Sequence, residues 1–343
     1  MSSELAIPKG STVLVTGVNG LIASHVADQL IQAGYNVKGT VRSEDKGKMM
    51  AETFEKRYSG KDAFSYVVVE DMSTKDAFHD AIKGCSGVAH VASDMTFRDD
   101  PNLVVTPVVA GVQNALKAAA ATPTVKRFVL TSSSNSLIVP TPNTKYHLDQ
   151  KTWNDISSKE AWKTEGFDPA MRPVHIYSAS KVEAERAAWK FIEIEKPQFV
   201  LNTVCPNFNI GEILDNRQAA SSAGYIKALW LGNPQITGIL QNFPPQFAVD
   251  VKDNARLHVA GLTMADVKGE RLIAMTEPFN YSRWCESLKK IDPSKEFPPP
   301  PENEGKDIST VDVKRSVELL KRMGLAGLTP LDESVRQLVA SVA

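Results

Sequence analysis

A tyrosine and a lysine four residues apart, Tyr177 and Lys181 in the run YSASK, are the residues of this chain best suited to proton transfer. Residues at this spacing share one face of a helix, so their side chains can meet. A phenol with its ordinary pKa of about 10 is a weak acid near neutral pH. A neighbouring ammonium stabilises the phenolate and lowers that pKa, so the sequence predicts Tyr177 as a proton donor tuned by Lys181.

A cluster of hydroxyl groups, 131–134, ends a predicted strand at 127–131. Parallel α/β sheets bind ligands at the carboxyl ends of their strands, so a serine there can reach a substrate oxygen. We expect Ser133 to hold a carbonyl oxygen whose negative charge grows during reduction, while Tyr177 supplies the proton. No side chain can supply the hydride, so this chemistry requires a nicotinamide cofactor.

A glycine-rich turn near the N-terminus is the predicted nucleotide site. The run GVNGLIA, 17–23, follows a β-branched run at 12–16 and opens a helical pattern at 21–33. This order places helix N-terminal amides and the positive end of the helix dipole against a pyrophosphate. The expected cofactor contacts in the turn are Gly17, Asn19, Gly20, Leu21 and Ile22.

The residues after the second predicted strand, 36–41, indicate which dinucleotide is bound. A free ribose 2′-hydroxyl is usually held by an acidic residue there, whereas a 2′-phosphate needs arginine or lysine. Arg42 offers a bidentate cationic fork, and Lys46 or Lys48 can add a point charge, which favours NADPH over NADH. Asp71, after the third predicted strand at 66–70, is placed to accept a hydrogen bond from the adenine amine.

Alternating strand and helix patterns position these groups. Repeated βαβ units predict an α/β fold with a Rossmann-type doubly wound parallel sheet. Further strands are expected at 88–92 and 199–204, and helices at 74–82, 103–121 and 174–195. The polar stretch 135–173 is expected to be an irregular loop.

A change of composition after residue 205 indicates a second, smaller lobe, because the alternation weakens and Pro, Asn and Gly become more frequent. We expect 1–205 to form the NADP-binding domain, catalytic residues included. Residues 206–343 are expected to form mainly a substrate-binding lobe, with about 247–275 returning to the first domain, where 247–251 can add a strand.

Composition excludes several classes of partner. A net charge of −1, with 42% hydrophobic and 23% charged residues, fits a soluble enzyme without affinity for nucleic acid or a membrane surface. Cys85, Cys205 and Cys285 are widely spaced, which favours free thiols in a reduced compartment. With no signal-peptide pattern and no run of about 18 apolar residues, we expect a cytoplasmic protein. The six histidines lack metal-ligand spacing, so no metal site is expected.

The ordered motifs resemble those of the extended short-chain dehydrogenase/reductase family. TGxxGxxA, a serine and YxxxK occur in that order from residue 16 to 181. The runs VLVTGVNG, VKGTVRS, GVAHVAS, KRFVLTSS and PPQF are similar to the dihydroflavonol-reductase-like branch and, within it, to yeast NADPH-dependent carbonyl reductases. The resemblance implies reduction of ketones and aldehydes, with Ser133, Tyr177 and Lys181 as catalytic residues.

The resemblance also implies roles for further residues. Lys181 is expected to bind the nicotinamide ribose, and Asn114 in GVQNAL to hold a water in the proton relay. The remaining expected cofactor contacts are Met72, Val91, Ala92, Ser93, Pro206 and Phe208. The expected substrate contacts are Phe97, Ser134, Val174, Tyr225 and Gln246, and Phe208 is also a candidate. Ile138 stands where plant relatives carry an asparagine that binds flavonoid hydroxyls, which disfavours a flavonoid substrate.

Two other functions stay open at this point. A nucleotide-sugar epimerase or dehydratase shares the serine, tyrosine and lysine but needs cationic groups for a sugar diphosphate, and the C-terminal part shows no such arginine cluster. A non-catalytic NADP-binding sensor can dispense with Tyr177 and Lys181, yet this chain has both. The sequence does not decide between a monomer and a homodimer.

Overall fold

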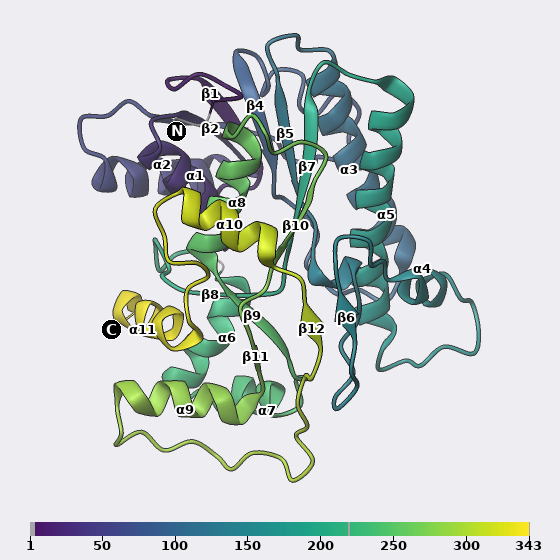
Figure 1. Ribbon diagram of the computed structural model, residues 1–343, viewed down its shortest axis with the longest axis vertical. Coiled ribbons are helices and arrows are strands. Elements are labelled where there is room, and N and C mark those ends of the chain that lie inside the picture. The colour runs from purple at the N-terminus through teal and green to yellow at the C-terminus, as the bar shows by residue number, and fades with distance from the viewer. Residues whose placement is uncertain (1–3, 219, 343) are drawn as a thin grey trace.

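The larger of the two parts of the molecule is built around a seven-stranded parallel sheet (Figure 1). The computed structural model describes residues 4–218 and 220–342. Neighbouring strands all pair in parallel, in the order β10-β7-β5-β4-β1-β2-β3. The strands are β1 (Thr12–Val15), β2 (Asn36–Val41), β3 (Phe64–Val68), β4 (Cys85–His90), β5 (Arg127–Thr131), β7 (Val200–Pro206) and β10 (Arg271–Ala274). The predicted Rossmann-type sheet is confirmed.

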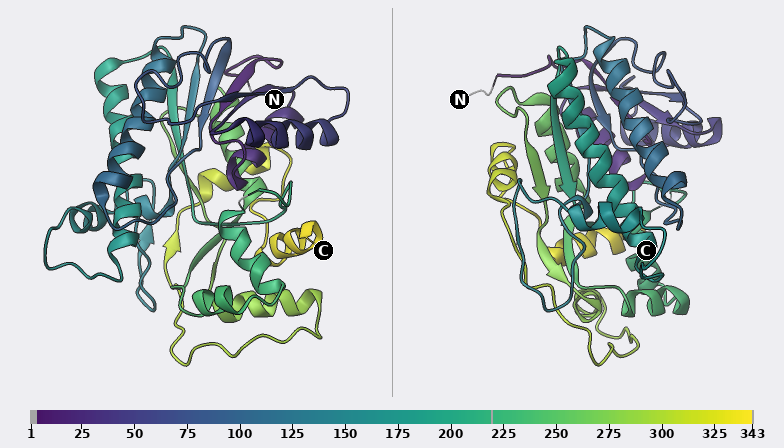
Figure 2. Two further views of the ribbon diagram at one scale, coloured as in Figure 1. Left: turned by 180° about the vertical axis from the view of Figure 1, so that it is seen from behind. Right: turned by 90° about the vertical axis from the view of Figure 1, so that its right-hand side faces the viewer.

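Helices cover both faces of this sheet and bury a separate apolar core on each. On one face lie α1 (Leu21–Gln32), α2 (Glu44–Arg57), α8 (Val251–Thr263) and α10 (Lys314–Arg322). On the other face α3 (Pro101–Ala120) and α5 (Arg172–Glu195) pack side by side, as both views of Figure 2 show. Both cores exist because β5 is buried along its whole length and its neighbours β4 and β7 are buried at all but one residue each.

Helix α3 is the one described helix that is long and apolar enough to cross a membrane by length and composition alone. Its buried side chains pack with those of α5 and the sheet in the second core. This packing explains its apolar character as that of a core helix.

A smaller lobe stands at the carboxyl edge of the sheet. Its three strands, β8 (Phe208–Ile210), β9 (Gln246–Asp250) and β11 (Glu277–Phe279), pair in the order β11-β9-β8. Its helices are α6 (Ser221–Trp230), α7 (Pro234–Gln241), α9 (Tyr281–Ile291) and α11 (Leu331–Val342). The side chains of these elements share a third apolar core, so the lobe has its own interior.

Three local expectations differ from the structure. Residues 74–82 form successive turns rather than a helix, and Asp76 has φ +61°, which a regular helix excludes. The stretch 135–173 is more ordered than expected and contains η1 (Ser134–Ser136), β6 (His147–Leu148) and α4 (Asp155–Ala161), with β6 pairing to β12 (Thr310–Val311). Strands β3 and β4 begin earlier than expected, at Phe64 and Cys85.

The segment 247–275 is divided between the two parts of the molecule. Its first strand, β9, pairs only with β8 and β11 in the small sheet, so it adds no strand to the large one. Helix α8 then packs on the large sheet, and β10 pairs with β7 at its edge. Helix α10, later in the chain, also packs there.

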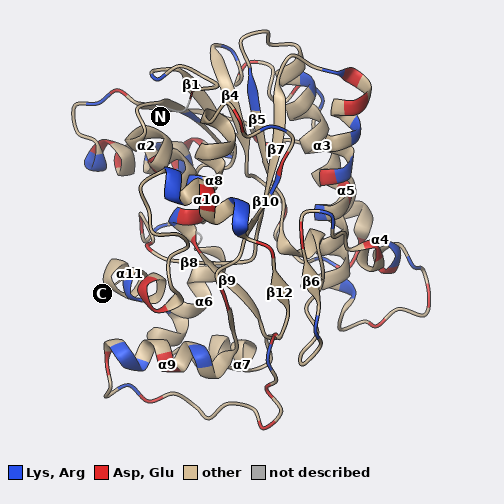
Figure 3. Ribbon diagram, in the orientation of Figure 1, with Lys and Arg blue, Asp and Glu red and all other residues tan. Residues whose placement is uncertain are grey.

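Charged residues of both signs are interspersed on the outer helices, for example along α5 and α9 (Figure 3). A nucleic-acid surface needs a basic patch or stripe on one face. The distribution of charge in the fold therefore agrees with the near-zero net charge of the chain.

Candidate active site

The glycine-rich turn between β1 and α1 is built to receive an anion. Gly17 has φ +66°, and a Cβ on it would lie 3.0 Å from the Cβ of Ala92, so both conformation and space require glycine. The N–H of Gly20 donates to the carbonyl of Gly17 at 2.9 Å. No side chain caps the N-terminus of α1, and its first turn has no acidic residue. Its amides can therefore face a pyrophosphate.

The end of β4 forms the next wall of this site. The hydroxyl oxygen of Thr16 accepts hydrogen bonds from the N–H groups of Val91 and Ala92, at 2.9 and 3.0 Å. The hydroxyl of Ser93 is buried and has no hydrogen-bond partner among the described residues. A buried hydroxyl without a partner costs free energy, which a polar ligand atom can recover. The segment 91–93 therefore fits its predicted cofactor contacts.

Arg42 and Asp71 lie near each other at the ends of β2 and β3. The hydroxyl and the N–H of Ser73 donate to the Asp71 carboxylate at 2.7 and 2.8 Å and hold its pKa below the ordinary value, with a smaller contribution from the charge of Arg42. Arg42 is exposed and forms no ion pair within the described parts of the chain. Lys48 is exposed on the adjacent helix α2. These cations suit a 2′-phosphate.

Asn114 holds the segment that follows β3. Its amide nitrogen donates to the carbonyl groups of Met72, Ser73 and Thr74 at 3.1, 3.0 and 2.9 Å. Met72 in turn packs on Gly111, where an added Cβ would lie 2.9 Å from the Met72 side chain. Both amide protons of Asn114 are thus occupied by this segment, so the predicted relay water has only its carbonyl oxygen as a ligand.

The structure brings the three predicted catalytic side chains together. Tyr177 and Lys181 lie on one face of α5, with the lysine Nζ 5.9 Å from the centre of the tyrosine ring. The hydroxyl of Ser133, at the end of β5, lies close enough to the phenol of Tyr177 to act on its pKa. Ser133 is buried and also accepts a hydrogen bond from the N–H of Asn135 at 3.1 Å. This arrangement can bind a carbonyl oxygen and protonate it.

Burial controls the protonation of these groups. It raises the pKa of Tyr177, and the Ser133 hydroxyl opposes this change only in part. It lowers the pKa of Lys181 to about 8, while Cys205 and Glu185 act in the opposite direction. The predicted lowering of the pKa of Tyr177 by Lys181 is therefore wrong for this structure, because loss of hydration outweighs the opposing effect of the Ser133 hydroxyl.

Of the expected substrate contacts, Phe97 packs on Tyr177, while Ser134 and Val174 are close to Ser133 and Tyr177 along the chain. The ring centre of Phe97 is 4.9 Å from that of Tyr177, and Phe97 remains 44% exposed. Phe97 has φ +51°, which is uncommon for a bulky residue. Residues with such strained backbone conformations cluster at functional sites. Ser134 directly follows Ser133 and begins η1. Val174 lies about one helical turn before Tyr177, and its backbone carbonyl accepts a hydrogen bond from the hydroxyl of Ser178.

The ring of Phe208 is a core residue of the small lobe. Its ring centre lies 4.9 Å from that of Phe279, 5.5 Å from Trp284 and 6.0 Å from Phe243. Only 6% of Phe208 is exposed. Its faces are packed within the lobe, and the expected contact with the nicotinamide or substrate stays a prediction.

The other predicted residues of the lobe boundary occupy different settings. Pro206 ends β7 opposite Ala274 of β10. Tyr225 on α6 is partly exposed, with its ring 6.0 Å from that of Phe243. Gln246 begins β9, is nearly buried and donates to the carbonyl of Pro244 at 3.4 Å. The structure connects neither Tyr225 nor Gln246 to Tyr177 by a contact between described residues.

Asn135 is a residue of this site that the sequence reasoning missed. Besides its N–H bond to Ser133, its amide nitrogen donates to the hydroxyl of Ser178 on α5 at 3.0 Å. It thereby joins the serine turn to the helix that carries Tyr177. The available signal was an asparagine directly after three serines, a residue type that often bonds to nearby backbone in turns.

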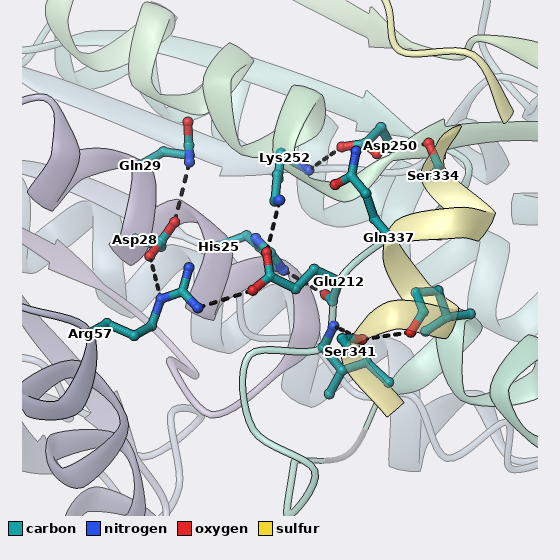
Figure 4. Close-up of polar contacts among 12 residues, drawn as sticks. His25, Asp28, Gln29, Arg57, Glu212, Asp250, Lys252, Ser334, Gln337 and Ser341 are labelled. Carbon is teal, nitrogen blue, oxygen red and sulfur yellow. Dashed lines mark hydrogen bonds and ion pairs between the residues drawn. The ribbon is translucent and has the colours of Figure 1, made fainter. Parts of the chain in front are cut away.

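A polar network connects the nucleotide-binding part to the small lobe (Figure 4). Arg57 of α2 bonds to Asp28 of α1 and to Glu212, which follows β8, at 3.0 Å in each case. Lys252 of α8 pairs with the carboxylate of Glu212 at 2.8 Å. The ring of His25 hydrogen-bonds with the backbone carbonyl of Glu212, also at 2.8 Å. The start of the lobe is thus held against α1 and α2.

The glycine-rich turn also contacts this part of the lobe. The side-chain amide of Gln218 donates to the carbonyl of Asn19 at 3.4 Å. Asn19 is one of the predicted cofactor contacts, and its backbone therefore takes part in the connection between the two parts of the molecule.

Known proteins with the same fold and sequence pattern identify the family. The model of the NAD-dependent epimerase/dehydratase family matches residues 13–211. Aldehyde reductase 2 of Sporidiobolus salmonicolor is 42% identical and aligns over 98% of this chain and 97% of its own. A ketoreductase of Penicillium rubens is 40% identical over 97% of both chains. Gre2 from Candida albicans, crystallised with NADPH, has a TM-score of 0.81 at 28% identity over 98% of both chains.

These matches extend over most of the chain, and the two enzymes resemble it in sequence from end to end. The resemblance read from its ordered motifs is confirmed. The chain belongs to the NAD-dependent epimerase/dehydratase family, the extended short-chain dehydrogenase/reductases.

Proposed function

We propose that this protein is an NADPH-dependent carbonyl reductase that converts small ketones and aldehydes to alcohols. The observation that carries the proposal is the meeting of Ser133, Tyr177 and Lys181 at the carboxyl edge of a sheet that also carries an anion-binding turn. The aldehyde reductase and ketoreductase relatives support this reaction class. The NADPH complex of Gre2 supports the cofactor.

The side chains supply everything in the reaction except the hydride. The nicotinamide, when bound, supplies hydride to the carbonyl carbon. The hydroxyl of Ser133 donates a hydrogen bond to the carbonyl oxygen and stabilises the negative charge that develops there. The phenol of Tyr177 transfers its proton to that oxygen, which yields the alcohol and leaves a phenolate. The ammonium of Lys181 stabilises the phenolate until it takes a proton from solvent.

The protonation states of the two residues on α5 suit this sequence. Since the pKa of Lys181 is about 8, most of its population is charged at neutral pH. Burial raises the pKa of Tyr177, so the phenol holds its proton before the reaction. The residue is therefore an acid that becomes active only when negative charge develops on the substrate oxygen.

The groups at the adenosine end favour the phosphorylated cofactor. Arg42 extends from the end of β2 and has no internal carboxylate partner within the described residues. A free guanidinium at this place can bind the 2′-phosphate with two parallel hydrogen bonds. Lys48 adds a second positive charge on α2.

The substrate is proposed to be apolar, since the phenyl ring of Phe97 covers Tyr177 and Ile138 stands near the serine turn. The free thiols of Cys85, Cys205 and Cys285 support a reduced, cytoplasmic location, which is also a proposal.

Oxidation of NADPH in the presence of a panel of carbonyl compounds tests the function. The panel contains aromatic ketones, β-ketoesters, aldehydes and a dihydroflavonol, and Tyr177→Phe is the matched inactive control. We expect turnover with apolar ketones or aldehydes and little with the dihydroflavonol. If the protein bound NADPH but oxidised it with none of these compounds, the proposal would be contradicted and an NADP-binding sensor favoured.

A further inference from the structure

A buried polar network centred on Glu185 lies directly behind the reacting groups. Helix α5 places Glu185 four residues after Lys181 and eight after Tyr177, on the same face. The Glu185 side chain is completely buried. A carboxylate in such a place is stable as an ion only when several donors surround it.

Trp189, one turn later on α5, donates to Glu185 at 3.3 Å, and the other donors come from distant parts of the chain. Arg271 of β10 donates to both carboxylate oxygens, at 2.7 and 3.1 Å. The hydroxyls of Ser132 and Thr203, after β5 and within β7, donate at 2.6 and 2.8 Å. Burial acts to raise the pKa of Glu185, but the pairing with Arg271 and the hydrogen bonds from Ser132 and Thr203 together outweigh it, so the net pKa is lowered and the carboxylate stays ionised at neutral pH.

Two of these contacts lead to the turn that carries Ser133. Ser132 precedes it directly in the chain and donates to Glu185. Arg271 also donates to the hydroxyl of Ser136 at 3.3 Å, and that hydroxyl donates to the carbonyl of Ser133 at 2.7 Å. The backbone on both sides of the Ser133 hydroxyl is therefore tied to the carboxylate on α5.

Arg271 extends the network to the loop before α4. It donates to the carbonyls of Gln150 and Thr152, each at 2.8 Å, and its guanidinium lies 3.8 Å from the ring centre of Trp153. The next residue, Asn154, donates to the carbonyl of Asn135 at 2.9 Å. The loop is thereby tied to the serine turn through Asn154 and Arg271.

We propose that Glu185, paired with Arg271, is a positioning residue that fixes the turn carrying Ser133 against the face of α5 that carries Tyr177 and Lys181. The inference rests on the proposed carbonyl reduction, because Glu185 is proposed to position Ser133 and Tyr177 relative to the substrate oxygen that they bind and protonate. Its geometric basis is that one carboxylate bonds to the neighbour of Ser133 while belonging to the helix of the proton donor.

Glu185 is also the negative charge that faces Lys181. The other titratable groups around Lys181 are Tyr177 on α5, Cys205 on β7 and His90 on β4. Burial raises the pKa of Cys205 to about 12 and lowers that of His90 to about 3, so neither is charged between pH 6 and 9. Removal of the Glu185 charge should therefore lower the pKa of Lys181 further.

Glu185→Gln tests this role, because glutamine keeps the shape and one acceptor oxygen but removes the charge. We expect kcat to fall about tenfold or more through misplacement of Ser133, with Kd for NADPH nearly unchanged. The decline of kcat at alkaline pH should begin at a lower pH than in the natural enzyme, because Lys181 loses its proton earlier.

Ser316→Ala is the matched control. Ser316 is equally buried, and its hydroxyl donates to the carbonyl of Ile273 at 2.7 Å, outside the Glu185 network. This variant should keep the natural kcat and pH profile. A Glu185→Gln enzyme with a natural kcat and a natural pH profile would overturn the proposal.

Ser132→Ala decides the question if Glu185→Gln does not fold. It removes a single hydroxyl between Glu185 and the serine turn, and we expect kcat to fall several-fold beyond the effect of Ser316→Ala while Kd for NADPH stays the same. Equal kcat in the two alanine variants would refute positioning. Failure of the proposed function is a separate outcome, since it would appear as NADPH binding without carbonyl reduction in the natural enzyme.

Discussion

The two halves of the sheet's carboxyl edge are built in opposite ways. Around β5 and α5, the polar groups are buried and bonded to one another, as Glu185 shows with its full set of internal donors. Around β2 and α2, the cations Arg42 and Lys48 are exposed, and neither has an ion-pair partner among residues 4–218 and 220–342. One half completes its hydrogen bonds internally, whereas the other leaves them to a ligand.

This difference follows from what each half does in the proposed reaction. Proton transfer needs groups held within a narrow range of geometry, and a buried, saturated network provides that rigidity. Recognition of a phosphate needs unpaired positive charge, since a cation already bonded to a carboxylate has little left to offer an anion. Substitutions in the buried half should therefore affect stability and turnover, and those in the exposed half cofactor affinity.

Glu185→Ala should have the largest effect on stability. Removal of one partner from a buried ion pair leaves Arg271 uncompensated and typically costs about 3–5 kcal/mol. Urea unfolding followed by tryptophan fluorescence measures the loss. Arg42→Ala is the comparison from the exposed half and should change the free energy of unfolding by less than about 0.5 kcal/mol. Equal losses in the two variants would remove the distinction between the halves.

Tyr177→Phe should have the largest effect on turnover with an intact fold. Phenylalanine keeps the packing against Phe97 but lacks the proton, so kcat should fall by about 10² or more. Fluorescence titration should find the Kd for NADPH nearly unchanged. Near-natural turnover in this variant would show that another group protonates the substrate.

Arg42→Ala should act on cofactor choice rather than on chemistry. Loss of charge-assisted hydrogen bonds to the 2′-phosphate should weaken NADPH binding about tenfold or more and leave NADH binding nearly unchanged. Lys56→Ala, at an exposed position in the last turn of helix α2, far along the helix from Arg42, is the control. Titration that finds equal losses for both cofactors would rule out the phosphate role.

Arg57→Ala should have the smallest of these effects, about 1 kcal/mol on the free energy of unfolding. Arg57 joins Asp28 to Glu212 in the network of Figure 4, but the buried Asp28 keeps hydrogen bonds from Tyr58 at 2.7 Å and Gln32 at 2.8 Å. The loss is measured by urea unfolding at low and high salt. A loss as large as that of Glu185→Ala would mean that this partly exposed network is as tightly coupled as the buried one.

Much of the fold was predictable because its signals are local. Buried strands such as β2 and β5 were predicted with their observed bounds, and α1 and α5 differ from prediction by one or two residues at their ends. Their signals are β-branched runs and helical periodicity within a few residues. The prediction of a helix at 74–82 was wrong. Phe78, Ala81 and Ile82 have helical spacing, but successive turns bury the same three side chains in the second core.

The division of roles among single residues was less predictable. The contacts of the Phe208 ring with Phe279 and Trp284 depend on how β11 and α9 pack against β8, and these two residues are more than 70 positions further along the chain. The three carbonyls that bond to Asn114 likewise come from a loop about 40 residues earlier. No local pattern contains these partners.

The sequence by itself determined the βαβ order, the anion-binding turn and the placing of Tyr177, Lys181 and Glu185 on one helix face, because these depend on spacing of a few residues. Only the tertiary structure decided that Ser133 meets Tyr177, that Arg271 pairs with Glu185, and that the pKa of Tyr177 is raised. The physical reason is that burial and long-range pairing set hydration and charge, and both arise only when distant segments pack together.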